Sequence, residues 1–151
     1  MGGLRQALQG QKVYLDANIF IYTLEGVEPW VHLLTDVFTG LTANEFSAVT
    51  SSLSLSECLV LPFKQNKSDL VAIFHEALLP SHYLTTAPID DRVLISAANI
   101  RAQTNLKLPD AIHAATALTQ QCTAMLTNDP GFKRVPGIEL FLLSDWISSP
   151  C

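Results

Sequence analysis

The sequence predicts an α/β domain in which helices cover both faces of a mostly parallel sheet of about five strands. Short apolar runs alternate along the chain with longer stretches in which apolar residues recur at helical spacing. The 151 residues are enough for one domain that removes about 70% of its unfolded surface from water. No repeat, low-complexity run or change in composition marks a second domain. We therefore expect a single domain over residues 1–151, beginning with a loose segment over residues 1–11.

The first third of the chain predicts a strand followed by two helices. Residues 13–15 form a short apolar strand, and Asp16 or Asn18 after it can cap a helix. Pro29 opens a second helical stretch, whose apolar residues share one face that belongs in the core or in a subunit interface. The residues of this face are Trp30, Leu33, Leu34, Val37, Phe38 and Leu41.

A second strand at 46–50 leads, through a run of serines, into a helix that carries Glu57 on its first turns. Pro62 is expected to bend or end this helix, because proline lacks the backbone N–H that a helix needs. The later elements continue the alternation of strand and helix. They are a helix capped by Ser68 or Asp69 through about Leu79, a strand at 82–86, a helix from Asp90 to about Thr104, a helix from Pro109 to about Gln121, strands at 124–127 and 138–142, and a closing helical turn at 144–147.

Composition indicates the setting in which this domain works. Hydrophobic residues make up 48% of the chain and charged residues 15%, so we expect some apolar surface to be buried between the subunits of a homo-oligomer. No apolar run has the length of a membrane span, and the opening residues lack the apolar centre of a secretion signal, which predicts a cytoplasmic protein. Cys58, Cys122 and Cys151 have no zinc-ligand spacing and are expected to be reduced, structural thiols.

Four carboxylates occupy separate apolar settings: Asp16 in VYLDANIFIY, Glu57 in SLSLSECLVL, Asp110 in LPDAIHAATA and Asp129 in AMLTNDPGF. Ligands of parallel sheets bind beyond the carboxyl ends of the strands, where Asp16 and Asp129 fall. Glu57 and Asp110 lie on the opening turns of helices and can face the same crevice. Clustered carboxylates raise one another's pKa unless a cation holds them, so we expect a Mg²⁺ or Mn²⁺ site. Such a site suits metal-assisted hydrolysis of a phosphodiester bond.

Each of these residues also has a structural explanation when taken alone. Asp16 can be a helix cap, Asp110 can compensate a helix dipole, and Asp129 is a good turn former. Glu57 can belong to a buried ion pair. All four explanations must hold together to remove the site. His113 can share a helix face with Asp110 as a ligand or base, but we favour an ordinary helix histidine whose polar atoms are satisfied within the fold.

The four motifs, in this order and spacing, resemble a PIN domain from about Val13 to Ile147, and most of all the VapC-type ribonuclease toxins of bacterial toxin–antitoxin pairs. The pairing of LPDAIHAATA with a strand and TNDPGF is the most specific part of the resemblance. The resemblance implies a three-layer α/β/α fold, metal-dependent cleavage of RNA and a homodimer bound by a small antitoxin protein. It also implies that the metal-binding and catalytic acids are Asp16, Glu57, Asp110 and Asp129.

Polar residues beside these acids match supporting positions of the same family. Asn18, and Thr127 or Asn128, match positions that hydrogen-bond a carboxylate or a metal-bound water. Lys133 and Arg134, just past the last acid, are candidates for contact with a phosphate. The net charge of −5 argues against a nucleic-acid partner, but four acids neutralised by metal would leave a nearly balanced surface. Net charge therefore does not decide the partner.

Two alternatives within the same fold are a solitary PIN nuclease without an antitoxin and a scaffold that docks RNA or protein without cleaving it. A different enzyme class, the haloacid-dehalogenase-like hydrolases and response-regulator receivers, also places an Asp at a strand end over Mg²⁺. The dehalogenase pattern needs a second Asp two residues later, where this chain has Asn18. A receiver needs a second acid beside the first and a Lys after a late strand, and neither is at the expected place.

Overall fold

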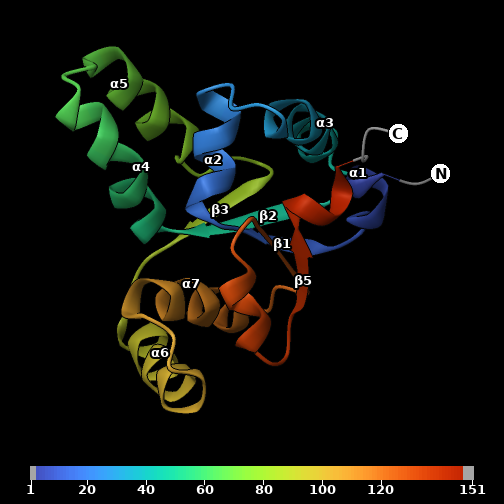
Figure 1. Cartoon of the computed structure of the whole chain (residues 1–151). Helices are drawn as coiled ribbons and strands as arrows, with labels where there is room; N and C mark the ends of the chain where they lie inside the picture. The colour runs from blue at the N-terminus through green and yellow to red at the C-terminus, as the bar shows by residue number, and fades with distance from the viewer. Residues whose placement is uncertain (1–2, 148–151) are drawn as a thin grey trace.

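A parallel sheet of five strands runs through the middle of the molecule (Figure 1). The structure is a computed structural model that describes residues 3–147, so residues 1 and 2 of the expected loose segment and Cys151 lie outside it. From one edge to the other, the strand order is β3-β2-β1-β4-β5. The strands are β1 (Lys12–Leu15), β2 (Ser47–Ser51), β3 (Leu84–Ala87), β4 (Ala124–Thr127) and β5 (Glu139–Leu142).

Helices cover both faces of this sheet (Figure 1). One face carries α1 (Leu4–Ala7), α2 (Ala17–Leu24), α3 (Trp30–Thr42), α4 (Ser52–Lys64) and α5 (Ser68–Ala77). The other face carries α6 (Asp91–Thr104) and α7 (Leu108–Thr119). Two 3₁₀-helices, η1 (Pro130–Arg134) and η2 (Leu143–Trp146), precede and follow β5. The predicted three-layer α/β/α fold is confirmed, and the sheet is parallel throughout.

The strand residues divide between two hydrophobic cores because side chains along a strand point alternately to opposite faces. In β1, Val13 and Leu15 pack into the core under α1–α5, whereas Tyr14 packs into the core under α6 and α7. In β4, Leu126 and Met125 divide in the same way. A strand that is buried on both sides reads as a continuous apolar run, which is why these strands could be recognised in the sequence.

The sheet changes direction beside its central strand. The chain builds β1, β2 and β3 outward to one edge and then returns to place β4 on the other side of β1. The backbone N–H of Asp16 donates to the carbonyl of Leu126 (3.2 Å), which joins the carboxyl ends of β1 and β4. Open α/β sheets bind their ligands at such a point, beyond the strand ends.

The start of the chain differs from the loose segment that the sequence predicts. Residues 4–7 form α1, and the side chains of Leu4 and Leu8 are buried in the core. Arg5 forms ion pairs with Glu45 and with Asp36, the latter at 3.1 Å. A helix of four residues is too short to show apolar periodicity, so only its buried contacts reveal it.

Several helix boundaries also differ from their predicted positions. Pro62 does not end α4, which continues to Lys64 with the proline buried in its last turn. Lys67, and neither Ser68 nor Asp69, is the N-cap of α5, since its carbonyl accepts the first helical bond from Val71. The predicted turn after Asp129 is the 3₁₀-helix η1, and α7 ends at Thr119.

Cys58 and Cys122 are buried and free, as expected of structural thiols. Burial, which is the main cause for both, raises the pKa of each thiol to about 12, so neither forms a reactive thiolate at neutral pH. Among residues 3–147, no helix combines the length and apolar character that a membrane crossing requires. The cytoplasmic location expected from the sequence stays a prediction.

Candidate active site

Asp16 lies immediately after β1 and caps α2, and both of its carboxylate oxygens are engaged. The Oδ1 atom accepts a hydrogen bond from the backbone N–H of Ala17 (2.8 Å). The Oδ2 atom accepts one from the Thr127 hydroxyl (2.6 Å) at the end of β4. The residue is only 8% exposed. The predicted cap and the predicted site residue are therefore the same carboxylate, fixed between the two adjacent strand ends.

Two of the three predicted supporting residues contact this carboxylate. The Thr127 hydroxyl also accepts a hydrogen bond from the backbone N–H of Asp129 (3.1 Å), so it links two of the acids. The Asn18 amide nitrogen donates to Asp16 Oδ2 (3.4 Å), while its Oδ1 atom is buried and has no hydrogen-bond partner within residues 3–147. Asn128 makes no such side-chain contact in the described part of the chain, so its supporting role stays a prediction.

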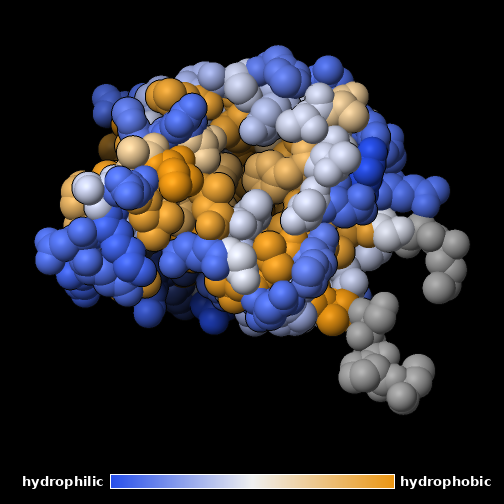
Figure 2. Space-filling model, turned by 90° about the horizontal axis from the view of Figure 1, so that it is seen from above, coloured by the Kyte–Doolittle hydropathy of each residue, from blue (hydrophilic) through white to orange (hydrophobic). Residues whose placement is uncertain are grey.

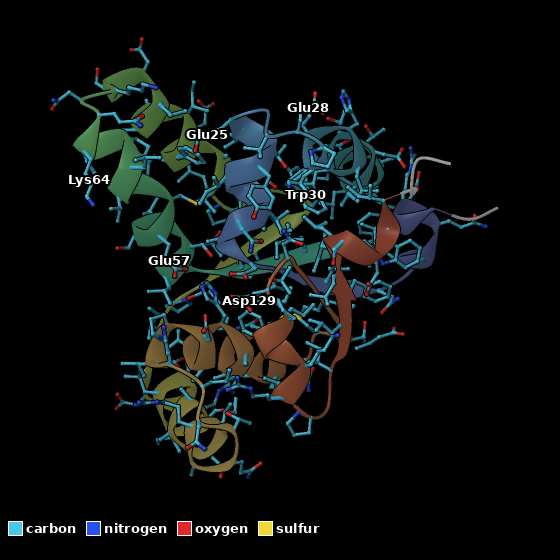
Figure 3. The ribbon with its side chains drawn as sticks, in the orientation of Figure 1. Glu25, Glu28, Trp30, Glu57, Lys64 and Asp129 are labelled. Atoms are coloured by element: carbon cyan, nitrogen blue, oxygen red, sulfur yellow. The ribbon has the colours of Figure 1, made fainter. Side chains whose placement is uncertain are left out.

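The side chain of Glu57 on α4 contacts that of His113 on α7, beyond the carboxyl ends of the strands. His113 Nε2 lies 2.5 Å from Glu57 Oε1 and 3.6 Å from Asp16 Oδ1. One ligand-capable atom from each of these three residues lies within 4.8 Å of the other two. Figure 3 labels Glu57 on α4 and Asp129 just after β4, in the space between α4 and α7. Three separate elements thus bring two acids and one imidazole together.

His113 is the residue whose place sequence reasoning undervalued. Its polar atoms are satisfied within the fold, as expected, but one of its partners is a site acid. Its Nδ1 atom lies 2.6 Å from the hydroxyl of Tyr14, which is fully buried in β1. Burial is the largest single influence on the pKa of His113 and lowers it. The hydrogen bond to Glu57 and the charges of the surrounding carboxylates together outweigh burial, so the pKa lies above its usual value. The three-residue spacing between Asp110 and His113 was the available signal.

Tyr14 adds a neutral group to this arrangement. Burial is the main cause that raises the pKa of its hydroxyl well above the usual value, and the charge of Asp16 adds to the effect. The nearby Thr50 hydroxyl lowers this pKa without reversing the direction of the shift. The Tyr14 hydroxyl therefore stays protonated at neutral pH. Nothing in the order of residues links it to His113, which lies 99 positions away.

Asp110 lies one helical turn before His113 on α7 and is half-buried. Burial raises the pKa of its carboxyl, and the charges of Asp129, Asp16 and Glu57 raise it further, against an opposing effect of His113. Its electrostatic coupling to the other three acids places Asp110 in the same acidic neighbourhood. It is not part of the tighter group formed by Asp16, Glu57 and His113.

Asp129 caps η1, so the turn explanation correctly describes its local role. Its Oδ1 atom accepts a hydrogen bond from the backbone N–H of Gly131 (2.8 Å). A Cβ atom at Gly131 would lie 3.1 Å from the same oxygen, so a glycine leaves this carboxylate its place. Because Asp129 also raises the pKa of Asp110, capping and membership of the acidic neighbourhood occur together.

The two predicted phosphate contacts lie at the end of η1. Lys133 and Arg134 are both exposed, and Arg134 Nη1 lies 3.5 Å from the carbonyl of Thr104 at the end of α6. Both cations thus follow Asp129 on the surface. Contact with a phosphate stays a prediction.

An apolar hollow of about 240 Å³ lies on the face that carries α2, α3 and α5. Figure 2 views the molecule from this side and shows apolar side chains gathered in its middle, bordered by hydrophilic ones. The helix α2 connects this hollow with the acids, because Asp16 caps its first turn and its later residues line the hollow. The lining residues are Phe20, Thr23, Leu24, Phe38, Ala77 and Tyr83.

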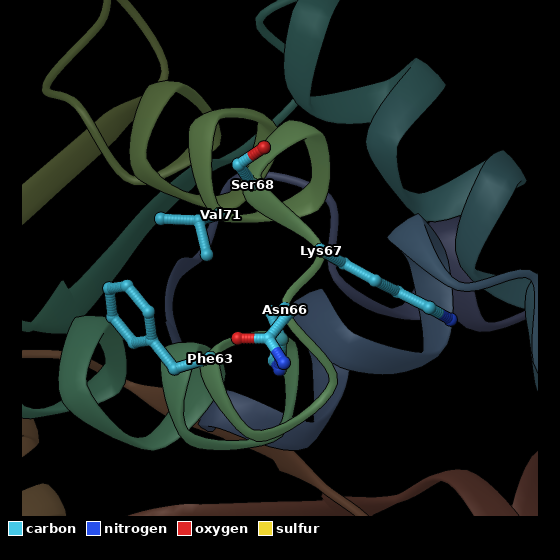
Figure 4. Close-up of a pocket in the computed structure, with 6 residues that line it drawn as sticks. Phe63, Asn66, Lys67, Ser68 and Val71 are labelled. Carbon is cyan, nitrogen blue, oxygen red and sulfur yellow. The ribbon is translucent and has the colours of Figure 1, made fainter.

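A separate hollow lies between the end of α4 and the start of α5 (Figure 4). Its lining includes Phe63, Asn66, Lys67 and Val71 but no carboxylate, so it is not part of the acidic neighbourhood. Large apolar side chains also remain exposed on α4 and α6, of which Phe63 at 62% and Ile95 at 72% are the most accessible.

One protein family and several solved structures resemble this chain. The family model described as PIN domain matches residues 13–138. This range contains the four predicted site acids, His113 and Tyr14. No curated protein matches the chain.

Solved structures with the same fold include toxin–antitoxin proteins. VapBC2 from Rickettsia felis, bound to a DNA fragment from its promoter, has a TM-score of 0.69 and 18% identity, covering 87% of this chain and 98% of that chain. A toxin–antitoxin complex from Klebsiella pneumoniae has a TM-score of 0.64 and 22% identity, covering 87% and 97%. VapC20 from Mycobacterium tuberculosis, a toxin that cleaves the sarcin–ricin loop, has a TM-score of 0.69 and 12% identity, covering 84% and 97%. At these identities the likeness shows the shared fold.

Proposed function

The chain belongs to the PIN domain family, and on that premise we propose that it is a metal-dependent endoribonuclease that hydrolyses phosphodiester bonds of RNA. The observation that carries this proposal is that Asp16 and Glu57 lie close together beside the carboxyl end of β1, where the sheet changes direction. Two further acids, Asp110 and Asp129, act electrostatically on the same place. A hydrolase of this kind needs such a group of carboxylates to hold a divalent cation.

The donor atoms suit Mg²⁺ or Mn²⁺, which prefer oxygen ligands. Burial is the main cause of the raised pKa of Asp110, and the charges of Asp129, Asp16 and Glu57 add to it, as expected of carboxylates gathered at one place. The buried Oδ1 atom of Asn18 accepts no hydrogen bond within residues 3–147 and so leaves an acceptor for a metal-bound water. We assign the cation to Asp16, Glu57, Asp110 and Asp129. When bound, it would offset the charge that develops on the phosphate and make a nearby water more acidic.

The other residues of the site hold these acids in place. Thr127 fixes Asp16 Oδ2 and the backbone of Asp129, and Asn18 contacts the same Asp16 oxygen. We propose that Asn128 supports the same group and that Lys133 and Arg134 bind a phosphate of the RNA. Replacing both Lys133 and Arg134 with Ala should weaken RNA binding while leaving metal binding unchanged.

We propose further that the enzyme is the toxin of a toxin–antitoxin pair. The likeness of its fold to VapBC2 from Rickettsia felis and to the toxin–antitoxin complex from Klebsiella pneumoniae supports this, and so does the apolar hollow between α2, α3 and α5. An antitoxin helix lying along this hollow would follow α2 toward Asp16, where a basic side chain could reach the acids. A small reading frame beside the gene would support the pair, and its absence would favour a solitary PIN nuclease.

The exposed apolar side chains of α4 and α6 support a homodimer. Phe63 and Ile95 leave most of their surface in water in the isolated chain, at a cost that burial against a second copy would remove. Sedimentation of the wild type and of a Phe63→Ser, Ile95→Ser double variant measures this. A dimer that dissociates in the double variant supports the proposal, and a wild-type monomer contradicts it.

The function is tested by incubating structured and unstructured RNA with the purified protein, with Mg²⁺ or Mn²⁺ and with chelator. Asp16→Asn removes a site charge, and Asp69→Asn is the matched control because Asp69 is exposed on α5. Cleavage by the wild type and the control, abolished by chelator and by Asp16→Asn, supports the nuclease. RNA binding without cleavage by any variant would favour the docking scaffold.

A further inference from the structure

We propose that His113 and Tyr14 are positioning residues, which hold the Glu57 carboxylate through hydrogen bonds, and that His113 is not a ligand of the cation. The inference deepens the proposed function and rests on it for its effect on metal binding. It follows from a line of contacts that crosses three elements: Tyr14 in β1, His113 in α7 and Glu57 in α4.

The surroundings of the imidazole decide where its proton lies. His113 Nε2 is 2.5 Å from Glu57 Oε1 and 3.6 Å from Asp16 Oδ1. An ionised carboxylate oxygen only accepts hydrogen bonds, so the nitrogen that faces two of them carries a hydrogen. A nitrogen that carries a hydrogen has no lone pair for a metal. His113 therefore acts on Glu57 as a hydrogen-bond donor.

Tyr14 fixes the ring from its other side. Its hydroxyl lies 2.6 Å from His113 Nδ1, and the two rings meet edge to face with their centroids 5.7 Å apart. The Tyr14 side chain is fully buried, and its strand is paired on both sides, with Val49 and Met125 as register partners. Because the strand that carries it is rigid, the Tyr14 hydroxyl fixes the orientation of the imidazole. When this hydroxyl donates to Nδ1, it favours the tautomer with its hydrogen on Nε2.

Glu57 needs this support more than Asp16 does. Asp16 has a short side chain with a backbone donor and a hydroxyl donor of its own. Glu57 has a longer side chain that is 34% exposed, and His113 is its only side-chain hydrogen-bond partner within residues 3–147. Outer partners that orient a ligand typically change metal affinity by about 10–100-fold when they are removed. We therefore expect the two positioning residues to set the affinity through Glu57.

The first measurement is calorimetric binding of Mn²⁺ to Tyr14→Phe, which deletes only the hydroxyl. The control is Thr116→Val, which deletes a fully buried hydroxyl of α7 that bonds the backbone of Ile112. We expect the Kd of Tyr14→Phe to rise by about 10-fold, at the lower end for an outer partner, and that of the control to stay near the wild-type value. Equal Kd values in the two variants, each with a wild-type-like unfolding transition, would overturn the proposal.

Two variants of His113 separate hydrogen bonding from packing. His113→Ala removes the donor, whereas His113→Gln keeps a side-chain N–H that can reach Glu57. We expect His113→Ala to raise the Mn²⁺ Kd by about 10–100-fold and His113→Gln to recover part of the loss. An unchanged Kd in His113→Ala, or an equal loss in both variants, contradicts a donor role.

A third readout needs no metal and separates this inference from the proposed function. In ¹⁵N-labelled, metal-free protein, the ring nitrogens of His113 report directly which of them carries a hydrogen. We expect a hydrogen on Nε2 in the wild type and a changed ring signal in Tyr14→Phe but not in Thr116→Val. A bare Nε2 overturns the inference even if the protein cleaves RNA. If the protein shows the expected signal but neither binds Mn²⁺ nor cleaves RNA, the hydrogen bonds between Tyr14, His113 and Glu57 are supported and the proposed function is contradicted.

Discussion

The two halves of the acidic site are built differently. The half carried by β1 and β4 contains Asp16, Thr127 and Asp129, which lie at neighbouring strand ends and are joined by hydrogen bonds of 2.6 and 3.1 Å. The half carried by α4 and α7 contains Glu57 and Asp110, of which Glu57 is held through His113. The strand half is fixed by the sheet itself, while the helix half depends on how two helices pack. Positions in the strand half should therefore tolerate substitution least.

Among substitutions that remove only a hydroxyl group, the largest effect is expected for Thr127→Val, which breaks the link inside the strand half. The change leaves Asp16 Oδ2 without its hydroxyl donor and the Asp129 N–H without its acceptor. We expect the Mn²⁺ Kd to rise by about 10–100-fold, more than in Tyr14→Phe. The metal-free protein should lose about 1–3 kcal/mol in the free energy of unfolding, measured by urea denaturation.

Thr116→Val again serves as the control, because it removes a hydroxyl that is buried equally well but bonds only its own helix. A smaller rise in Kd for Thr127→Val than for Tyr14→Phe would reverse the comparison, and the helix half would then be the more sensitive one.

A smaller effect is expected for Gly131→Ala, which disturbs the strand half without removing a hydrogen-bonding group. The new Cβ atom would lie 3.1 Å from Asp129 Oδ1, so this carboxylate must shift by a few tenths of an ångström. We expect the Mn²⁺ Kd to rise by about 2–5-fold, less than for a lost outer partner. In Gly3→Ala, the matched control, the added Cβ meets nothing within 4 Å, and affinity should not change.

The smallest effect concerns the helix half in the absence of metal. The folded protein holds the pKa of Asp110 above the usual 3.8, so Asp110 stabilises the fold below pH 3.8 and this contribution is lost as the pH rises through the folded pKa. At neutral pH the charged carboxylate therefore works against folding. We expect Asp110→Asn to raise the Tm in chelator by about 1–2 °C at pH 7, a small shift because the group is partly solvated.

The Asp110→Asn comparison also has a pH arm and a metal arm. The difference in Tm from the wild type should shrink as the pH falls, because Asp110 then becomes protonated and resembles Asn. Mn²⁺ should stabilise the wild type more than the variant. A Tm for Asp110→Asn below that of the wild type in chelator at pH 7 would show that its charge is compensated in the metal-free site.

The strand half of the site could be predicted from the sequence, and the reason is geometric. An acid that follows a buried apolar run must lie at the end of a strand, and strand ends in a parallel sheet meet at one edge. Asp16 and Asp129 follow such runs, so their location required no knowledge of distant contacts. The same periodicity located the five strands and the longer helices.

The helix half could be predicted only in outline. Glu57 and His113 are 56 positions apart, and their hydrogen bond depends on the rotation and approach of α4 and α7, which periodicity does not specify. Tyr14 reads as an ordinary strand residue until α7 is placed beside it. The short helix α1 could not be predicted for a related reason: the burial of its leucines can be recognised only when the rest of the core is present.

The position of β4 in the sheet has a consequence for protein synthesis. This strand comes late in the chain, after residue 123, yet it lies beside the central strand β1 and carries Thr127 at its end. A chain still emerging from the ribosome can contain Asp16 and Glu57 for most of its elongation without completing the acidic centre. The acidic group gains Thr127 and Asp129 only after residues 124–129 have been made and β4 has paired with β1.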